Sequence, residues 1–600
     1  MNTRRQFLIT AAMGGLTAAA CQRQSPPGST TTTPATPGAP PAFGTAPGVG
    51  PEVSASTFAE AGKLAQVSMT DAERQTAAGN WRRMMAPLVE RRVGPRKVTL
   101  EPELAPATRW DPRLAPNSGG PAGDRFVRSA GDRAPLPAND TDVAFAPVTQ
   151  LSRWIENKAI TSERLTSIYL DRIAKHDGRL RSVITVTREA ALAQARQADA
   201  EIAAGRYRGP LHGIPYGVKD LLDTAGIPTT YGAEPFKNRV PGVDAAVVRK
   251  LKEAGAVLVA KLSLGALALN DIWFGGQTMN PWLTEEGASG SSCGPGAATA
   301  AALVGFSIGS ETGGSIISPA MRCGITGLRP TFGRVPRTGA MTLCWTLDKL
   351  GPMTRTVEDA MLVLGTIGGP DAADSGSIPC HLDFDATAPV TGLRVGYFPA
   401  WMKEPPATDV DRAALSTAEK LGMSTKAVTL PDWPYSSLMP VLLAEAAASF
   451  EEITLNGAVS TMKVQVPDAW PNIFRQSRFL SAVDFVQADR LRRRVALEMA
   501  RIFSEVDLLL VPSLRDEMLT ISNFTGHPSL TLRAGFVNIS EARSDWAPDP
   551  NRPLPKFSPS RRVPHGVTLI GRLFDEGTIA RAGLALERTL GVNGERPSGY

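Results

Sequence analysis

The 600-residue sequence predicts an α/β protein in which a β-sheet is covered by helices on both faces. Residues 211–220 form a short apolar segment that leads into a lysine, which is typical of a buried strand. Residues 245–254 place their apolar side chains on one helical face, and Gly255 follows where a helix would end. The apolar run 256–260 predicts a second strand. This alternation of strand, helix and strand is typical of α/β sheets.

Helices precede this unit, and a second alternation follows it. In residues 149–175 the apolar side chains recur near the helical period, which predicts one or two amphipathic helices. Farther along, two turns rich in glycine and serine, residues 287–296 and 309–315, bracket an alanine-rich helix and a strand-like segment that ends near Ile308. The same layered arrangement therefore extends well beyond the first unit.

The second of these turns has the composition of an anion-stabilising site. Gly313 and Gly314 stand directly before Ser315, and glycines let the backbone approach closely, so that several amide N–H groups can point at one developing negative charge. Such a turn suits an oxyanion hole. An ordinary turn is the alternative. A P-loop is excluded because no Gly-Lys-Ser/Thr follows the glycines.

Composition and charge narrow the function classes. The chain is 42% hydrophobic and 20% charged, as globular proteins are. A net charge of +6 without a concentrated basic stripe argues against a nucleic-acid partner. The five histidines and five cysteines form no local zinc motif, so we expect neither a metal nor a cofactor. The cysteines are Cys21, Cys293, Cys323, Cys344 and Cys380.

The first 21 residues predict an export signal. The pair Arg4-Arg5 precedes a weakly apolar stretch that is too short to span a bilayer, and it resembles the twin-arginine signal. Small residues end at Ala20, where a signal peptidase would cut. Cys21 is a candidate lipoprotein cysteine that would tether the protein to a membrane, although Ala18 stands where a large aliphatic residue is usual. We therefore expect an exported protein, periplasmic or membrane-tethered, and leave lipidation open.

Two segments separate this signal from the main domain. Residues 22–56 are rich in Pro, Thr and Gly, which predicts a disordered linker. Residues 57–145 predict an N-terminal extension, helical from Thr57 to Ala86 with Asp71 as a candidate cap, and irregular afterwards. No chemistry can be assigned to this extension from its residues.

Motifs in the remaining region, residues 146–595, resemble those of the amidase signature family of hydrolases. The matching elements are Gly213 to Asp220, Asn280-Pro281-Trp282, Ser289 to Gly296, Gly309 to Ser315, Pro319-Ala320, Cys323 to Thr331, Asp507 to Pro512, Asn523 to Pro528 and Leu569 to Asp575. The resemblance implies one large catalytic domain with a mixed central β-sheet covered by helices on both faces. It also implies an amidase that cleaves a carboxylic amide through a serine acyl-enzyme.

The family's Ser, cis-Ser, Lys triad falls by motif on Ser315, Ser291 and Lys219. The resemblance implies that Ser315 attacks the carbonyl while its proton passes through Ser291 to a neutral Lys219. A free lysine has a pKa of about 10.4, so Lys219 must be buried to act as a base. Taken singly, the lysine would be solvated, Ser291 a turn former and Ser315 a helix cap.

Roles can also be assigned to several residues around the triad. The resemblance implies that the backbone N–H groups of Thr312, Gly313 and Gly314, with that of Ser315, hold the oxyanion. Ser292 either supports that loop or caps a helix. Asp220 is expected to be structural, and His527 is expected to be packed rather than catalytic.

Three positions depart from the family pattern. Cys293 stands where a glycine is common, Ile317 where an arginine is common, and Glu311 where an aspartate is frequent. None is a triad member, so the departures bear on the substrate pocket and on the residues around the triad. Cys293 is either a small buried filler or a thiol that makes the enzyme sensitive to thiol reagents.

The substrate is less well determined than the reaction. Seven aromatic residues between 370 and 500 either line a pocket for a hydrophobic or aryl amide or belong to the core. They are Trp401, Trp433, Tyr435, Phe450, Trp470, Phe474 and Phe479. Two other functions stay open: the glutaminase subunit of a tRNA-dependent amidotransferase, and a tethered binding lipoprotein without turnover. The sequence does not determine the oligomeric state.

Overall fold

The computed structural model describes residues 47–65, 68–96, 110–114, 120–130 and 134–600, all within one compact unit. The predicted export signal, Cys21 and most of the predicted linker lie outside the described residues. Among the described helices, none combines the length and the apolar character needed to cross a membrane.

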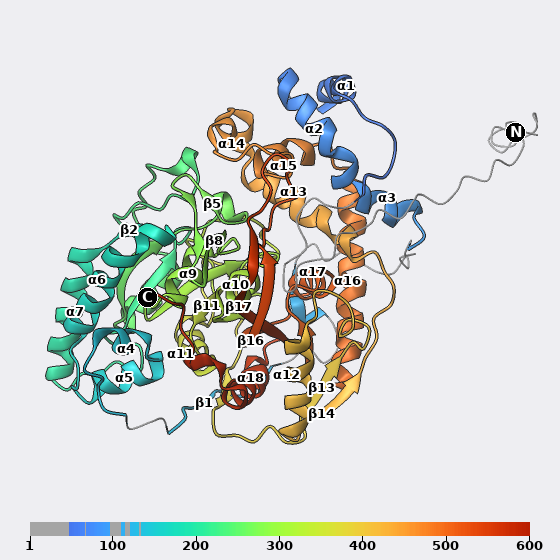
Figure 1. Cartoon of the computed structure of the whole chain (residues 1–600). Helices are drawn as coiled ribbons and strands as arrows, with labels where there is room; N and C mark the ends of the chain where they lie inside the picture. The colour runs from blue at the N-terminus through green and yellow to red at the C-terminus, as the bar shows by residue number, and fades with distance from the viewer. Residues whose placement is uncertain (1–46, 66–67, 97–109, 115–119, 131–133) are drawn as a thin grey trace, which may run out of the picture. The chain divides into compact units, whose positions relative to one another are not determined.

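The described part of the domain is built on one mixed sheet of eleven strands, which confirms the predicted α/β class. In spatial order the strands are β14 (Ser424–Ala427), β13 (Arg394–Tyr397), β15 (Leu508–Pro512), β17 (Lys556–Gly571), β16 (Ser529–Glu541), β10 (Thr326–Arg329), β11 (Lys349–Thr354), β9 (Phe306–Glu311), β3 (Pro215–Lys219), β4 (Val257–Leu262) and β2 (Val183–Val186). In Figure 1 the sheet runs from β2, beside α6 and α7, to β13 and β14, beside α12. Strand β3 pairs in parallel with β4 and β9, whereas β9, β11, β10, β16 and β17 pair antiparallel in turn.

Outside the main sheet, the described residues contain six short strands, which pair in three two-stranded sheets, and the helices. The short strands are β1 (Arg125–Val127), β5 (Ile272–Trp273), β6 (Gly276–Gln277), β7 (Met279–Asn280), β8 (Leu283–Gly287) and β12 (Asp383–Asp385). The helices are α1 (Ala55–Ala65), α2 (Asp71–Met84), α3 (Ala86–Val93), α4 (Asp140–Phe145), α5 (Val148–Glu156), α6 (Ser162–Leu180), α7 (Arg188–Ala203), α8 (Ala246–Glu253), α9 (Cys293–Ala300), α10 (Ile317–Cys323), α11 (Val357–Ile367), α12 (Asp409–Lys420), α13 (Met439–Ser449), α14 (Glu451–Leu455), α15 (Trp470–Ser477), α16 (Ala482–Glu505), α17 (Asp516–Phe524) and α18 (Glu576–Leu590).

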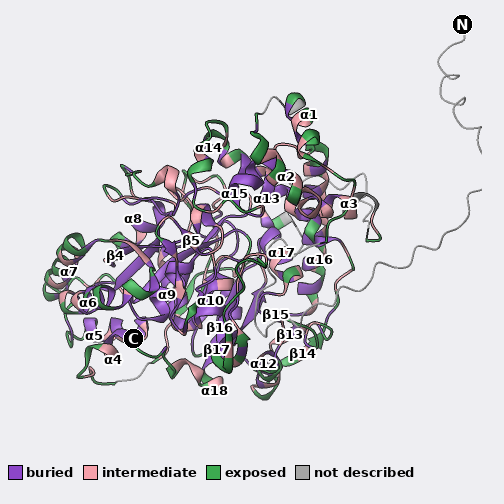
Figure 2. Cartoon of the chain, turned by 45° about the horizontal axis from the view of Figure 1, so that its top comes forward, coloured by how far each residue is buried: buried purple, intermediate pink, exposed green. Residues whose placement is uncertain are grey.

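Alternating side chains along β4 bury both faces of the sheet. Val257 and Val259 pack in one apolar cluster with residues of α6, α7 and α9. Leu258 points the other way, into a larger cluster that includes Val247 and Leu251 of α8. Helices therefore cover both faces here, as the alternation in the sequence predicts. Figure 2 shows the buried residues concentrated in the central strands and in α9 and α10.

The first part of the N-terminal extension is helical in α1, α2 and α3, so helix continues past the predicted end at Ala86 to Val93, and the cap of α2 differs from the predicted one. Thr70, not Asp71, caps α2, because its side chain accepts from the N–H of Glu73 while the Glu73 carboxylate accepts from the N–H of Thr70. Two contacts attach α2 to α15: Arg475 pairs with Glu73 at 2.8 Å, and Gln476 donates to the Ala77 carbonyl at 2.8 Å. The extension is thus packed on the main domain.

Candidate functional site

Lys219 ends strand β3 with its side chain fully buried. Its Nζ lies 2.8 Å from Ser291 Oγ, 3.0 Å from Ser292 Oγ and 2.9 Å from Ser310 Oγ. Three hydroxyl groups therefore surround one amine inside the sheet. This geometry rules out a solvated lysine at the strand end, which was the alternative that the sequence left open.

Burial controls the charge of this amine. Removal from water disfavours the ammonium form and lowers the pKa of Lys219 to about 7, while Asp348 and Glu311 act in the opposite direction. Both carboxylates have closer partners, since Glu311 pairs with Arg329 at 2.6 Å and Asp348 accepts from Thr312. A substantial fraction of Lys219 is therefore neutral near pH 7.

Ser292 supports the lysine rather than capping a helix. It occupies the N-cap position of α9, but its side chain makes no capping bond. Its Oγ donates to the Ser310 carbonyl at 3.1 Å and accepts from the Ser310 N–H at 3.2 Å, so toward Lys219 it can only accept. When a neutral Lys219 donates its two hydrogens to Ser292 and Ser310, its lone pair is left for the Ser291 hydroxyl.

Ser291 follows a turn that a distant loop holds in place. The Gly290–Ser291 peptide is cis, as the family resemblance implies. One carboxylate oxygen of Asp545 accepts from the Ser289 hydroxyl at 2.7 Å and from the Gly290 N–H at 2.9 Å. Ser289 has a φ of 66°, in the left-handed region that residues with side chains rarely adopt. The bonds to Asp545 therefore secure an uncommon backbone conformation beside Ser291.

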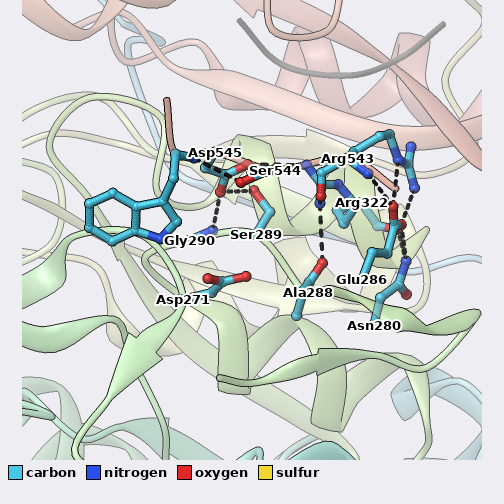
Figure 3. A network of polar contacts seen from close by, with 12 residues as sticks. Asp271, Asn280, Glu286, Ala288, Ser289, Gly290, Arg322, Arg543, Ser544 and Asp545 are labelled. Carbon is cyan, nitrogen blue, oxygen red and sulfur yellow. Dashed lines mark hydrogen bonds and ion pairs between the residues drawn. The ribbon is translucent and has the colours of Figure 1, made fainter. Parts of the chain in front are cut away.

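Asp545 belongs to a buried polar network (Figure 3). Arg322, which is 1% exposed, pairs with Asp545 at 3.1 Å and donates to the carbonyl oxygens of Gly287 and Arg543. Glu286 pairs with Arg543 at 2.6 Å, with both side chains fully buried. The two arginines thus balance Asp545 and Glu286, whereas burial and the Asp545 charge raise the pKa of the neighbouring Asp271 to about 7.

Sequence reasoning missed Asp545 and Arg322. Asp545 lies more than 250 residues after Ser289 and Gly290, which it contacts, and Arg322 stands between two of the matching elements without belonging to either. The one available signal was Asn280 of the Asn-Pro-Trp element, whose amide donates to Glu286 at 2.8 Å in the same network (Figure 3).

Glu311 shapes the turn that carries Ser315. One Glu311 oxygen accepts from the N–H groups of Ile316 at 2.8 Å and Ile317 at 2.9 Å. Burial acts to raise the pKa of Glu311, but Arg329 and these N–H groups outweigh it, so the pKa is lowered and the carboxylate stays charged. Gly314 has a φ of 129°, which residues with side chains rarely adopt.

The turn exposes backbone donors beside Ser291. Within the described residues, no acceptor is bonded to the N–H groups of Thr312, Gly313, Gly314 and Ser315. The Ser292 N–H donates to the Ser315 carbonyl at 3.2 Å, which joins the two serine turns. Ser315 is not a helix cap, because α10 begins after Ile316 and has no side-chain cap. The arrangement can stabilise a negative charge next to a hydroxyl.

A cavity of about 830 Å³ begins at this turn, and Ser310 and Thr312 contribute to its wall. The aromatic residues predicted between 370 and 500 do not line it: Phe450 and Phe474 stack at 5.3 Å, and Trp470 and Phe474 at 5.1 Å, as part of the core. The aromatic side chains that do line the cavity are Trp110, Phe332 and Trp345.

The other candidate residues have structural surroundings. Asp220 pairs with Lys261 at 3.1 Å and accepts from Thr230, so it does not serve Lys219. His527 is buried, which lowers its pKa to about 3. Cys293 is also buried, and burial raises the pKa of its thiol to about 11. The four described cysteines are all free, and no described cluster of His, Cys, Asp and Glu could hold a metal ion.

Comparison with known proteins gives a consistent picture. A family model described as Amidase matches residues 164–579. A glutamyl-tRNA(Gln) amidotransferase subunit from Moorella thermoacetica is 35% identical over 489 residues, 76% of this chain and 99% of that protein. AmiD of Mycobacterium bovis, provisionally described as an amidase, is 35% identical over 482 residues, 78% of this chain and 99% of that protein. The native peptide amidase structure from Stenotrophomonas maltophilia has a TM-score of 0.63 and 28% identity, covering 75% of this chain and 98% of that one.

Proposed function

The chain belongs to the amidase family, whose members hydrolyse the C–N bonds of amides, and from this premise we propose that it cleaves a carboxylic amide through a serine acyl-enzyme. Ser315 is the nucleophile, Ser291 relays the proton and Lys219 is the base. The observation that carries the proposal is the fully buried Lys219 amine, 2.8 Å from the Ser291 hydroxyl, with a pKa of about 7.

The hydroxyl proton of Ser315 moves through Ser291 to Lys219, along the hydrogen bond between Ser291 and the lysine amine. As Ser315 Oγ attacks the amide carbonyl carbon, its proton passes to Ser291 Oγ, and the Ser291 proton passes to the lone pair of Lys219 Nζ. The tetrahedral adduct then collapses, the C–N bond breaks, and the departing nitrogen receives a proton by the reverse route. A water molecule attacks the resulting ester with the same relay, which releases the acid and restores Ser315.

The turn before Ser315 supplies the electrostatic part of catalysis. Negative charge develops on the carbonyl oxygen, and the N–H groups of Thr312, Gly313, Gly314 and Ser315 are available to receive it. In comparable hydrolases one well-placed donor contributes roughly 3 to 4 kcal/mol to the transition state. Glu311 holds the turn in shape by accepting from the N–H groups that follow the serine.

The test uses purified protein and a panel of aliphatic, aryl and peptide C-terminal amides, with Ser315→Ala as the control. We expect hydrolysis by the wild type alone, and covalent labelling of the wild type alone by a serine-directed fluorophosphonate. Equal labelling of Ser315→Ala, or no labelling of either protein, would instead favour a tethered binding protein without turnover.

A glutaminase role within a tRNA-dependent amidotransferase is the second candidate, and the relative from Moorella thermoacetica favours it. This role would require glutamine as the amide and a partner that uses the released ammonia. The predicted export signal at Arg4-Arg5 argues against it. Specific turnover of glutamine, with little activity toward other amides in the panel, would support the glutaminase.

We further propose that the enzyme acts outside the cytoplasm, either free in the periplasm or tethered through a lipid on Cys21. The support is the twin-arginine pattern and the small residues before Cys21. Mass spectrometry of the mature protein distinguishes the two forms, since lipidation adds the mass of acyl chains to a polypeptide that starts at residue 21. A chain that retains Met1 and stays in the cytoplasm would refute export.

A further inference from the structure

The wall of the cavity at the catalytic turn includes a piece of the N-terminal extension. Trp110, Asp111 and Arg113 line the cavity, together with residues from the loops after β3 and β10. These three residues lie outside the part of the chain that matches the family model, which begins at residue 164. The extension, to which the sequence assigned no chemistry, thus contributes to the space beside Ser310 and Thr312.

Trp110 is held firmly in that wall. It is 8% exposed, and the Arg492 guanidinium of α16 lies 3.4 Å from its ring centroid. Arg492 is itself fixed, because it donates to the carbonyl oxygens of Phe524 and Thr346 at 2.6 Å each. The ring also meets Phe332 edge to face, with centroids 6.4 Å apart. A ring fixed on several sides presents a defined surface to a ligand at little entropic cost.

Charges in the wall are already paired. Arg113 pairs with Asp111 at 2.7 Å, and Arg337 pairs with Asp374 at 2.9 Å. Asp348 accepts from Thr312 at 2.6 Å and from two backbone N–H groups. A charged ligand would have to displace one of these partners, so the wall favours an uncharged one.

The ring surfaces and the volume of the cavity indicate what the ligand must offer. The aromatic surfaces of Trp110 and Phe332 favour a ring on the ligand. A volume of about 830 Å³ is ample for such a molecule.

We propose that Trp110 is a specificity-determining residue that selects large, uncharged, aromatic amides, with the ring of the substrate in this cavity against the Trp110 ring. The inference rests on the proposed amidase function, because the cavity matters only if amides react at Ser315. A small amide such as acetamide lacks the ring that this proposal places against Trp110.

Binding to an inactive variant tests the cavity apart from the chemistry. We would measure by calorimetry the binding of N-acetylphenylalaninamide to Ser315→Ala and to the same variant carrying Trp110→Ala or Trp110→Phe. We expect the alanine change to weaken binding about tenfold or more, and phenylalanine, which keeps a ring but lacks the N–H, to have a smaller effect. Equal affinity of all three proteins would overturn the proposal.

Kinetics on an otherwise native enzyme give the second measurement. For Trp110→Ala we expect a higher KM for N-acetylphenylalaninamide and unchanged kcat/KM for acetamide. Trp401→Ala is the matched control, because Trp401 also carries an arginine, Arg515, over its ring but does not line the cavity. A loss shared equally by both substrates would mark Trp110 as merely structural and refute the assignment. Hydrolysis that persists in Ser315→Ala would refute the proposed function instead, while the binding result would stand.

Discussion

Replacing Lys219 by methionine should stabilise the protein at neutral pH while abolishing its activity. Burial lowers the pKa of the Lys219 amine from the ordinary 10.5 to about 7. When the amine is protonated in both the folded and the unfolded protein, this shift costs the folded protein about 5 kcal/mol. Methionine is of similar length and carries no charge. It loses the contacts with three hydroxyl groups, which contribute about 1 kcal/mol each. The variant should therefore be more stable by about 2 kcal/mol near pH 7.

The pH dependence gives the sign of this effect. Between pH 7 and 10.5 the unfolded chain holds a proton on Lys219 that the folded protein has released, so the stability of the wild type rises with pH over this window. Below about pH 7 both states are protonated, and the penalty is complete. The advantage of the methionine variant should thus shrink by about 1.4 kcal/mol for each pH unit above 7 and reverse at about pH 8.5. At pH 10 the variant should be the less stable protein, because most of the penalty has gone and the lost hydrogen bonds remain.

Urea unfolding at pH 7 and pH 10, for the wild type and Lys219→Met, measures the difference. Lys175→Met is the matched control, because Lys175 is exposed on α6 and its replacement should give the same small change at both pH values. If the stability difference between Lys219→Met and the wild type is the same at pH 7 and pH 10, burial does not neutralise the amine, and the argument for a lysine base fails.

Three further outcomes follow from the site. For the wild type, kcat/KM should rise with pH through about 7 as Lys219 loses its proton and then level off; a flat profile from pH 5 to 9 would contradict a titrating base. Asp545→Asn removes the charge that pairs with Arg322 and should loosen the turn before Ser291. We therefore expect kcat to fall by up to about 100-fold with KM little changed. A rise in KM at constant kcat would instead assign Asp545 to substrate binding. Peptide mapping during iodoacetamide treatment should find Cys380 modified well before Cys293. Burial raises the pKa of both thiols to about 11, but only Cys380 is partly accessible. Rapid loss of activity with Cys293 labelled first would contradict its burial.

Local sequence patterns predicted the secondary structure near the site well, because periodicity and end signals are encoded within a few residues. Strand β3 ends on Lys219 as predicted, and Gly255 follows α8 with a φ of 78°. Boundaries were less accurate: the segment predicted as helical from Thr57 to Ala86 contains two helices, α1 and α2, and the cap of α2 is Thr70. A capping residue depends on side-chain geometry, which composition alone does not specify.

The proposed triad was recognisable by motif, whereas the residues that support it were not. Ser291 and Lys219 lie in elements that resemble a family, and the structure brings them within hydrogen-bonding distance. Asp545 and Arg322 act through contacts between segments more than 200 residues apart. Such contacts leave no local pattern, since an aspartate in a loop looks the same whether it holds a turn or faces water.

The sequence by itself determined the α/β class, the strand that ends on Lys219 and the two serine turns, because hydrophobic periodicity and glycine placement act over short distances. Only the tertiary structure decided the charge of Lys219 and the identity of the cavity wall. Desolvation depends on everything that packs around a group, and the cavity wall likewise gathers residues from distant segments, such as Trp110 and Thr312.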